Sequence, residues 1–281
     1  MPEMPEVEVH VRHLRPLLRG KTIRSVKVSR ERTTRPTPPR EFEKVLAGAK
    51  FKDLSRRGKY LLFELQPKNS KKPLTVLGHL GMTGRMYLAG KNGELPRHAA
   101  VVFDLGDRNF IFEDWRYFGR MTLDLSPIEK LGPEPLDKNF SPELFWESLK
   151  KSRQSIKVKL LDQSLVAGVG NIYASEALFR AKISPKLPAN RLTLAQAKEL
   201  LRAIRDVLND SIKAGSTFSL KAIEGGPGAL FYFDDGSESY YERRLRVYDR
   251  AGKPCLNCKT KIVRITQAAR STYFCPSCQR K

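Results

Sequence analysis

The sequence predicts an α+β protein of two domains, in which a leading helix and a β-sandwich precede a helical domain and a four-cysteine module. Three observations support this prediction. The chain has 281 residues, enough for two domains that each bury a core. Short β-rich runs occupy the part before Leu125, whereas helical periodicity follows it. All four cysteines lie together near the C-terminus.

The first element is expected to be an amphipathic helix over residues 5–19, which Gly20 would end. At helical spacing, its apolar residues fall on one face: Val7, Val11, Leu14, Leu17 and Leu18. Burial of that face would anchor the N-terminus of the chain to a core.

Short runs rich in β-branched and aromatic residues predict the strands Ile23–Val28, Tyr60–Leu65, Leu74–Leu77, Ala100–Phe103, Phe110–Phe112 and Met121–Leu125. Turn-forming residues separate these runs, a pattern typical of a β-sandwich or flattened barrel. The segment 33–40 contains three prolines, and we expect it to be an extended loop.

Helices are expected after a linker. Residues 126–140 include Gly132-Pro133-Glu134-Pro135 and show no periodicity, which predicts an interdomain linker. Further on, Thr193 and Gln196 have the spacing of a capping box, and Gly215 would end the helix. Between them an apolar stripe predicts a core face: Ala197, Leu200, Leu201, Ile204, Val207, Leu208 and Ile212.

The chain is strongly basic, with a formal net charge of +22 spread along its length. Such a charge favours a polyanionic partner, because cations that neutralise phosphates release condensed counterions. A basic structural protein, such as a ribosomal component, is the alternative that charge alone leaves open. The sequence contains neither a bilayer-spanning apolar run nor a basic signal-peptide start, so we expect an intracellular protein.

The cysteines form two CxxC pairs, Cys255 with Cys258 and Cys275 with Cys278, separated by sixteen residues. This spacing lets four thiolates surround one zinc ion tetrahedrally. Four protein ligands leave no position for water, so we expect a structural zinc that stabilises a hairpin. A thioredoxin-like redox pair is the alternative, but it needs one CxxC at the start of a helix, and strand-like runs flank these pairs.

The N-terminus allows two interpretations. Pro and Glu in the first turn of a helix match its macrodipole, which makes residues 1–8 an ordinary acidic helix start. Alternatively, removal of Met1 before a small residue frees the secondary amine of Pro2, which is weakly basic enough to act as a nucleophile near neutral pH. Its adduct with an aldehyde carbon is a charged iminium, and Glu3 would serve beside it as an acid or base.

Four motifs in order resemble one enzyme family. They are the Pro2-Glu3 start, the run Arg56–Leu62, the segment Gly168–Glu176 and the cysteine quartet. Together they resemble bacterial-type formamidopyrimidine-DNA glycosylases over nearly the whole chain. The resemblance implies a catalytic β-sandwich domain at 1–125, a linker at 126–140, a helix-two-turn-helix DNA-binding domain at 141–243 and a zinc finger at 244–281.

The resemblance also implies roles for individual residues. Pro2 matches the Schiff-base nucleophile, Glu3 the proton donor to the deoxyribose, and Glu6 a supporting carboxylate. Lys59 matches a lysine that contacts DNA at the lesion and assists β-elimination, and Arg270 matches the zinc-hairpin arginine that binds phosphates and assists δ-elimination.

Further positions match DNA contacts of the family. Met82, Arg116 and Phe118 match the side chains that fill the space left by a flipped base. The remaining predicted contacts are His98, Arg153, Lys157 and Asn171. Without the resemblance, Met82 and Phe118 would more often be core residues, and Lys59 an exposed cation before a strand.

The implied function is a bifunctional glycosylase and AP lyase of base excision repair that removes oxidised purines, namely formamidopyrimidines and 8-oxoguanine, and cleaves the strand by β,δ-elimination. Its partner would be damaged double-stranded DNA, its only cofactor one structural Zn2+, with no organic cofactor and no membrane. We expect a monomer in the bacterial cytoplasm, associated with the nucleoid. One alternative is an endonuclease VIII-like enzyme for oxidised pyrimidines, which Met4 and the presence of all three space-filling residues, Met82, Arg116 and Phe118, disfavour. The other is a noncatalytic zinc-ribbon protein that binds damaged DNA.

The sequence departs from the family pattern at several positions. Trp115 and Tyr117 stand where the family usually has Pro and Arg, and Ala100 replaces a second histidine. The segment 225–241 replaces a polar loop over the flipped base with an apolar run. These differences predict altered lesion specificity, with formamidopyrimidines and some oxidised pyrimidines excised at least as well as 8-oxoguanine. They leave every catalytic group in place.

Overall fold

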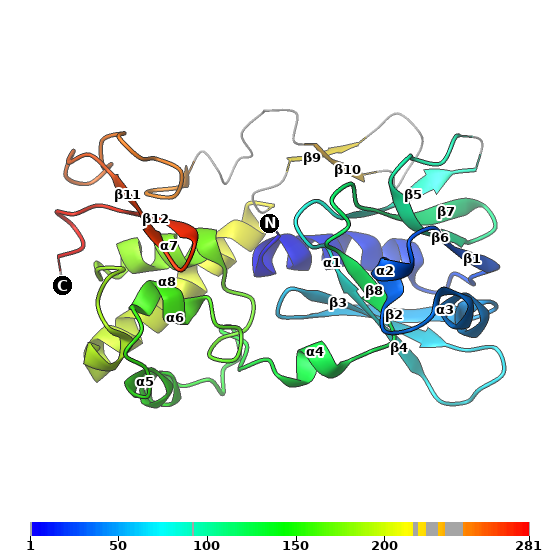
Figure 1. Ribbon diagram of the computed structural model, residues 1–281, viewed down its shortest axis with the longest axis horizontal. Coiled ribbons are helices and arrows are strands. Elements are labelled where there is room, and N and C mark those ends of the chain that lie inside the picture. The colour runs from blue at the N-terminus through cyan, green and yellow to red at the C-terminus, as the bar shows by residue number, and fades with distance from the viewer. Residues whose placement is uncertain (1, 92, 216–218, 223–229, 234–243, 281) are drawn as a thin grey trace. The chain divides into compact units, whose positions relative to one another are not determined.

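The computed structural model describes residues 2–91, 93–215, 219–222, 230–233 and 244–280. These residues form two compact units (Figure 1). Most of the first unit is residues 6–129, and the second contains residues 3–5 together with the described residues from 130 to 215 and from 244 to 280. Each unit has a large hydrophobic core of its own.

The first unit is mainly β-structure. Its elements in chain order are α1 (Met4–Leu18), β1 (Ser25–Val28), α2 (Glu31–Thr34), α3 (Pro39–Leu46), β2 (Lys50–Arg57), β3 (Tyr60–Gln66), β4 (Leu74–His79), β5 (Arg85–Gly90), β6 (Ala99–Asp104), β7 (Arg108–Glu113), β8 (Arg120–Thr122), α4 (Ser126–Glu129), β9 (Ser219–Ala222) and β10 (Leu230–Phe233). The first residues of α1 are assigned to the second unit.

Two antiparallel four-stranded sheets form the predicted sandwich, in the strand orders β1-β6-β7-β5 and β2-β3-β4-β8 (Figure 1). Aromatic side chains join them. The ring of Phe51 on β2 lies edge-on to Phe103 and Phe110 of the other sheet, at centroid distances of 6.4 and 6.2 Å. The leading helix adds its predicted apolar face, since Val7, Val11, Leu14 and Leu18 are all buried. The α+β prediction for this half is confirmed.

The prediction of an extended loop over residues 33–40 is wrong at both ends of the segment, and only residues 35–38 lie outside helices. Residues 31–34 form α2, and α3 begins at Pro39. Prolines forbid a helix interior, but they suit the position before a helix and its first residue, where the missing N–H is not needed. The hydroxyl of Thr34 donates to the carbonyl of Thr37 and so closes the turn between the two helices. Strands β2 and β5 were not expected; in β2, charged residues interrupt the apolar pattern.

The second unit is helical. Its regular elements before the cysteines are α5 (Pro142–Lys150), α6 (Ile156–Leu160), α7 (Asn171–Arg180), a 3-10 turn η1 (Ala189–Arg191) and α8 (Leu194–Lys213). The capping box at the start of α8 is confirmed, as is its buried stripe. That stripe packs with α5 and α7 residues in one core, to which Met4 also contributes. Among the described helices, none is long and apolar enough to cross a bilayer.

The C-terminal module is a hairpin of β11 (Val263–Gln267) and β12 (Arg270–Phe274). Ala268 and Ala269 connect the strands, and both have positive φ angles, of 47° and 57°, as a two-residue hairpin turn requires. The strands predicted beside the CxxC pairs are therefore present. Arg270 is exposed at the tip of this hairpin.

Candidate functional site

Antiparallel register gathers several predicted site residues at one end of the sandwich. In one sheet Tyr60 lies opposite His79, and His79 lies opposite Arg120. In the other sheet the end of β7 lies opposite the starts of β5 and β6. The loops β4–β5 and β7–β8 connect the sheets at this end. The residues brought to it are Lys59, Met82, His98, Arg116 and Phe118.

Asp114 ties the two connecting loops together. Its carboxylate accepts hydrogen bonds from Thr83 Oγ1 at 2.6 Å, from the amide of Gly119 at 2.7 Å and from the amide of Arg116 at 3.2 Å. A Cβ on Gly81, which has a φ of +63°, would lie 2.6 Å from the Gly119 nitrogen, so the loops touch where only glycine fits. Both loops are therefore held in a fixed conformation.

Lys59 and His79 lie close together at this end. Lys59 is buried, with only 9% of its surface exposed. The His79 ring packs on Tyr60 at 4.8 Å between centroids, and its Nδ1 accepts from the amide of Gly81 at 3.1 Å. Burial, aided by the charges of Lys59 and Arg120, lowers the pKa of His79 to about 4. A neutral His79 whose Nδ1 accepts must carry its proton on Nε2 as a donor.

The same loops present apolar side chains to solvent. Met82 and Phe118 are 42% and 44% exposed. The guanidinium of Arg116 lies 5.0 Å from the ring centroid of Phe118. His98 Nδ1 lies 2.8 Å from the hydroxyl of Tyr117. Exposed apolar groups on a fixed loop mark a surface that is built to meet a partner.

In the second unit, Glu3 is held by the start of helix α7. Its carboxylate accepts hydrogen bonds from the amides of Ile172 at 2.9 Å and Tyr173 at 3.4 Å, and only 2% of its surface is exposed. These are donors that a helix leaves unsatisfied at its N-terminus, where the macrodipole also favours a negative charge. A Cβ on Gly170 would lie 2.3 Å from the carboxyl carbon, so glycine is required beside it.

Three polar side chains surround the same helix start. Lys157 Nζ donates to Asn171 Oδ1 at 2.5 Å, and Asn171 also bonds the hydroxyl of Tyr248. Burial lowers the pKa of Lys157 to about 8; the charge of Glu3 opposes this and that of Arg270 reinforces it. The charge of Glu3 therefore acts on Lys157 at the start of α7.

The cysteine quartet fits a zinc ion. The four sulfur atoms lie within 4.8 Å of one another, and two of the pairs, Cys255–Cys278 and Cys258–Cys275, are 3.9 and 3.4 Å apart. Sulfurs at about 2.3 Å from a tetrahedral zinc would be about 3.8 Å apart. Backbone amides of Asn257 and Cys278 point at sulfurs of the quartet, at 3.4 Å each, and would stabilise thiolates.

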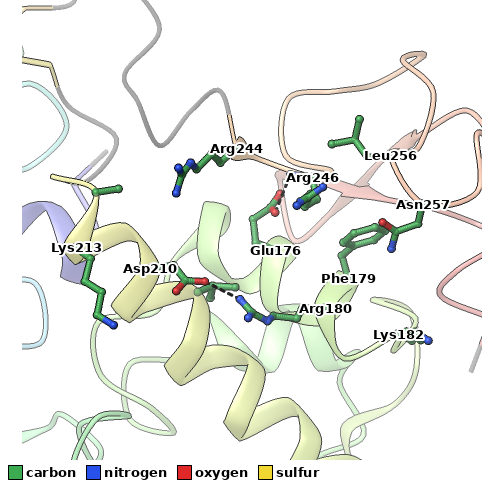
Figure 2. A pocket seen from close by; sticks show the side chains of 12 residues that line it. Glu176, Phe179, Arg180, Lys182, Asp210, Lys213, Arg244, Arg246, Leu256 and Asn257 are labelled. Carbon is green, nitrogen blue, oxygen red and sulfur yellow. Dashed lines mark hydrogen bonds and ion pairs between the residues drawn. The ribbon is translucent and has the colours of Figure 1, made fainter.

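A cavity of about 890 Å³ in the second unit holds none of the predicted site residues. Figure 2 shows five cations around it: Arg180, Lys182, Lys213, Arg244 and Arg246. Its acidic groups are engaged within the protein. Asp210 accepts from Arg180 at 2.8 Å, and Glu176 accepts from the amide of Arg246 at 2.9 Å. The two acids that line the cavity are therefore structural.

Comparison with known proteins agrees with the two units. Three family models match in order: the formamidopyrimidine-DNA glycosylase N-terminal domain over residues 1–121, its H2TH domain over 131–222, and the zinc finger found in FPG and IleRS over 252–280. The chain is 38% identical to the formamidopyrimidine-DNA glycosylase of Carboxydothermus hydrogenoformans, over 100% of both chains. It is 42% identical to that of Symbiobacterium thermophilum, over 99% of this chain and 89% of the relative.

The chain belongs to the formamidopyrimidine-DNA glycosylase family.

Solved structures of this family have the same fold. A mutant of the Lactococcus lactis enzyme in complex with a Fapy-dG containing DNA superposes with a TM-score of 0.87, at 34% identity over 100% of both chains. The wild-type enzyme of that organism in complex with an oxidized pyrimidine containing DNA gives the same TM-score, at 35% identity. The predicted helix-two-turn-helix domain and the zinc finger are confirmed, and the quartet Cys255, Cys258, Cys275 and Cys278 is a structural zinc site of the glycosylase family.

The predicted site residues of this glycosylase fall into two groups and three separate cases. Lys59, Met82, His98, Arg116 and Phe118 belong to the sandwich end, and Glu3, Lys157, Asn171 and Arg270 to the start of α7. Pro2 and Glu6 are buried near the start of α1. Arg153 is exposed between α5 and α6, and no described interaction joins it to either group. The divergent segment 225–241 lies largely outside the described residues, so its predicted effect on specificity stays a prediction.

Sequence reasoning missed three members of these groups. His79 ends an apolar strand directly before the Gly81–Gly84 run, and a polar residue at that point was the available signal. No sequence signal marked Tyr248 or Asp114, because each acts through contacts with residues distant in the sequence.

Proposed function

We propose that this DNA glycosylase of base excision repair attacks the C1′ atom of a damaged nucleotide with the amine of Pro2 and then cleaves the strand as an AP lyase. The attack breaks the bond between C1′ and the base, and the base leaves with a proton. The sugar ring then opens: the C1′–O4′ bond breaks, O4′ takes a proton, and C1′ becomes the carbon of an iminium. The iminium accepts the electrons of the C2′–H bond, so loss of the C2′ proton expels the 3′ phosphate. A second elimination expels the 5′ phosphate and leaves a one-nucleotide gap.

The observation that carries this proposal is the placement of Glu3. Glu3 is the residue next to Pro2, and it is buried. Its carboxylate is fixed by hydrogen bonds from the amides of Ile172 and Tyr173. A carboxyl held there can transfer a proton to the sugar as the ring opens. A purely structural acid at a helix start would not need burial beside Lys157, whose own charge is weakened.

Other residues complete the proposed roles. Lys59 and Arg270 would bind phosphates beside the damaged nucleotide and assist the two eliminations, and Glu6 would support the amine. Met82, Arg116 and Phe118 would fill the space that the flipped nucleotide leaves. Asn171 and Lys157 would bind phosphate at the start of α7, where backbone amides favour an anion, and His98 and Arg153 would add contacts to the DNA.

Borohydride trapping tests the proposal directly. Reduction of the iminium links the protein covalently to DNA that contains a damaged base. We expect trapping by protein whose intact mass lacks Met1, and none by a form that retains Met1, because the nucleophile is then part of an amide. Trapping by the Met1-retaining form would show that another amine reacts.

Oxidised pyrimidines are a second substrate class, and one observation favours them. The structurally similar Lactococcus lactis enzyme has been solved with an oxidized pyrimidine containing DNA as well as with Fapy-dG. Formamidopyrimidines and 8-oxoguanine remain the first class. Single-turnover excision rates on matched duplexes, each carrying one of these lesions, would rank the two classes.

We further propose that the protein works as a monomer in the bacterial cytoplasm, bound to the nucleoid, without an organic cofactor. Its net charge of +22 supports association with DNA at low specificity. Sedimentation of the free protein and its complex with a duplex would test the monomer, and localisation of a tagged chain the nucleoid association.

A further inference from the structure

The loop between β7 and β8 exposes a large aromatic side chain that none of the predicted roles uses. Trp115 is 56% exposed, more than either Met82 at 42% or Phe118 at 44%. Within the described residues, it has no hydrogen bond, ring contact or cation contact. An indole left this open offers apolar area and a ring face whose burial against a partner is favourable.

The loop that carries Trp115 is rigid on both sides of it. Asp114, the preceding residue, is buried and accepts three hydrogen bonds from the two loops. Tyr117 has a φ of +53°, a strained conformation for a side chain with a Cβ. Its hydroxyl lies 2.8 Å from His98 Nδ1 and 3.2 Å from Arg30 Nη2, which keep it in place. Binding through Trp115 therefore costs little loop entropy.

The surroundings of Trp115 indicate what kind of partner it meets. The guanidinium of Arg116 lies over the Phe118 ring, and that of Arg30 lies 4.7 Å from the centroid of Tyr117. Aromatic rings alternating with cations are typical of surfaces on which nucleobases stack while phosphates are neutralised. An apolar protein surface would leave these guanidinium groups without counter-charges.

We propose that Trp115 is a further DNA-contacting residue of this glycosylase, which stacks its indole on a nucleobase beside the flipped nucleotide. The inference rests on the proposed function, because it takes duplex DNA as the partner of the sandwich end. It adds a fourth side chain to Met82, Arg116 and Phe118, and it gives this chain a stacking surface that a proline at the same position would lack.

Intrinsic fluorescence can test this contact, because the chain has two tryptophans. Trp146 is partly buried, its Nε1 donates to the carbonyl of Leu192 at 2.8 Å, and Lys150 covers its ring. In the full-length Trp146→Phe protein the emission comes from Trp115 alone. Titration with a duplex that contains an uncleavable abasic-site analogue should quench most of that emission, whereas Trp115→Phe protein should show an unchanged Trp146 signal.

Binding measurements give a second readout. Trp115→Ala should weaken affinity for the same duplex about ten-fold, the value expected for one lost base–aromatic stack. Trp115→Phe should recover most of it, and Leu144→Ala, which removes an equally exposed apolar side chain from α5, should bind like the wild type. Unfolding midpoints of all variants show whether a loss is structural.

Emission that is the same in free and bound Trp146→Phe protein, or wild-type affinity in Trp115→Ala, would overturn the proposal. Quenching by an acidic protein or polyglutamate but not by DNA would do the same and would assign the surface to a protein partner. Borohydride trapping of the wild-type protein in parallel distinguishes the absence of a Trp115 contact from failure of the proposed chemistry. Quenching without trapping would leave the Trp115 contact standing and remove the Pro2 mechanism.

Discussion

The two groups of site residues each depart from the usual distribution of side chains, in which apolar groups are buried and charged groups are exposed. At the sandwich end, apolar groups such as Met82 and Phe118 face solvent. At the start of α7, the charged groups Glu3 and Lys157 are 2% and 1% exposed. Each arrangement costs stability in the free protein.

The difference indicates that the two groups do different work. Exposed apolar side chains gain free energy only when a partner covers them, so they suit recognition of DNA with an opened stack. Buried charges with fixed hydrogen bonds are already arranged for proton transfer and gain little from further ordering. Substitutions in the two groups should therefore change binding and chemistry separately.

The largest expected effect is on chemistry. Glu3→Gln keeps one oxygen as an acceptor for the amides of α7 but cannot transfer a proton, so excision should fall by about 10²- to 10⁴-fold. Affinity for an uncleavable lesion duplex should stay within a few-fold of the wild type. Single-turnover rates beside binding isotherms measure the two quantities, and an equal loss in both would reduce Glu3 to a helix cap.

Removal of zinc should weaken the affinity for DNA and leave the N-terminal amine chemically intact. The metal contributes folding free energy of about 10–16 kcal/mol in small zinc modules, so chelation or Cys255→Ser should unfold the β11–β12 hairpin and displace Arg270. We expect affinity for the lesion duplex to fall by about a hundred-fold, in line with lost phosphate contacts. Gel-shift titrations with and without chelator test this, and restored binding after zinc is added back is the control. Undiminished affinity in metal-free protein would contradict the prediction.

Raising the pH through 8 should weaken DNA binding at the start of α7. The pKa of Lys157 is lowered to about 8, so its charge is lost there, and its contribution to affinity is present below pH 8 and absent above it. Between pH 7 and 9 the slope of log K against log salt should fall by about 0.7, because one phosphate contact contributes about 0.9 and about four-fifths of the Lys157 charge is lost. Lys157→Met should remove this change, and Lys159→Met, which alters a neighbouring lysine, should keep it.

The same shift affects folding in the opposite direction. The folded state binds fewer protons on Lys157 than the unfolded state does between pH 8 and the ordinary lysine pKa. This group alone therefore makes the fold more stable as the pH rises through that interval. A Lys157→Met variant should show a flatter pH dependence of its urea midpoint.

The smallest expected effect is on the rigidity of the sandwich end. Asp114→Asn weakens hydrogen bonds that a buried carboxylate accepts from both loops, which should lower the free energy of unfolding by about 2 kcal/mol. Urea denaturation measures it. Asp107→Asn, an exposed aspartate of the same unit, should leave the midpoint unchanged. A stable Asp114→Asn protein would show that other contacts hold the loops.

Elements with regular periodicity could be predicted from the sequence. The stripe of α8 and the capping box at Thr193 are local patterns, and the structure contains both. The spacing of the four cysteines predicted the zinc site equally well, because two CxxC pairs at this distance are typical of zinc ligands. Strand β2 was missed because its alternation, from Lys50 to Arg57, is crowded with charges that salt bridges such as Arg15–Asp53 partly neutralise.

The candidate site was predictable only in part, for a physical reason. Residues carried by a motif, such as Glu3 and Asn171, could be named in advance. Their hydrogen bonds could not, since Glu3 meets amides about 170 positions away in the chain. Tyr248 and Asp114 likewise acquire their roles from register and packing, which no local pattern encodes.

Glu176 links helix α7 to the segment that leads into the zinc finger. From inside α7 it accepts hydrogen bonds from the amides of three successive residues, Arg246, Val247 and Tyr248, at 2.8 to 2.9 Å. Burial raises the pKa of this carboxyl, so without those donors it would be left as an unsatisfied acid in the interior. Because all three donors are backbone amides, a chimera joined between α8 and residue 246 keeps these hydrogen bonds only if its α7 carries a glutamate at this position. The zinc finger can therefore be transplanted only onto an enzyme whose α7 supplies that carboxylate.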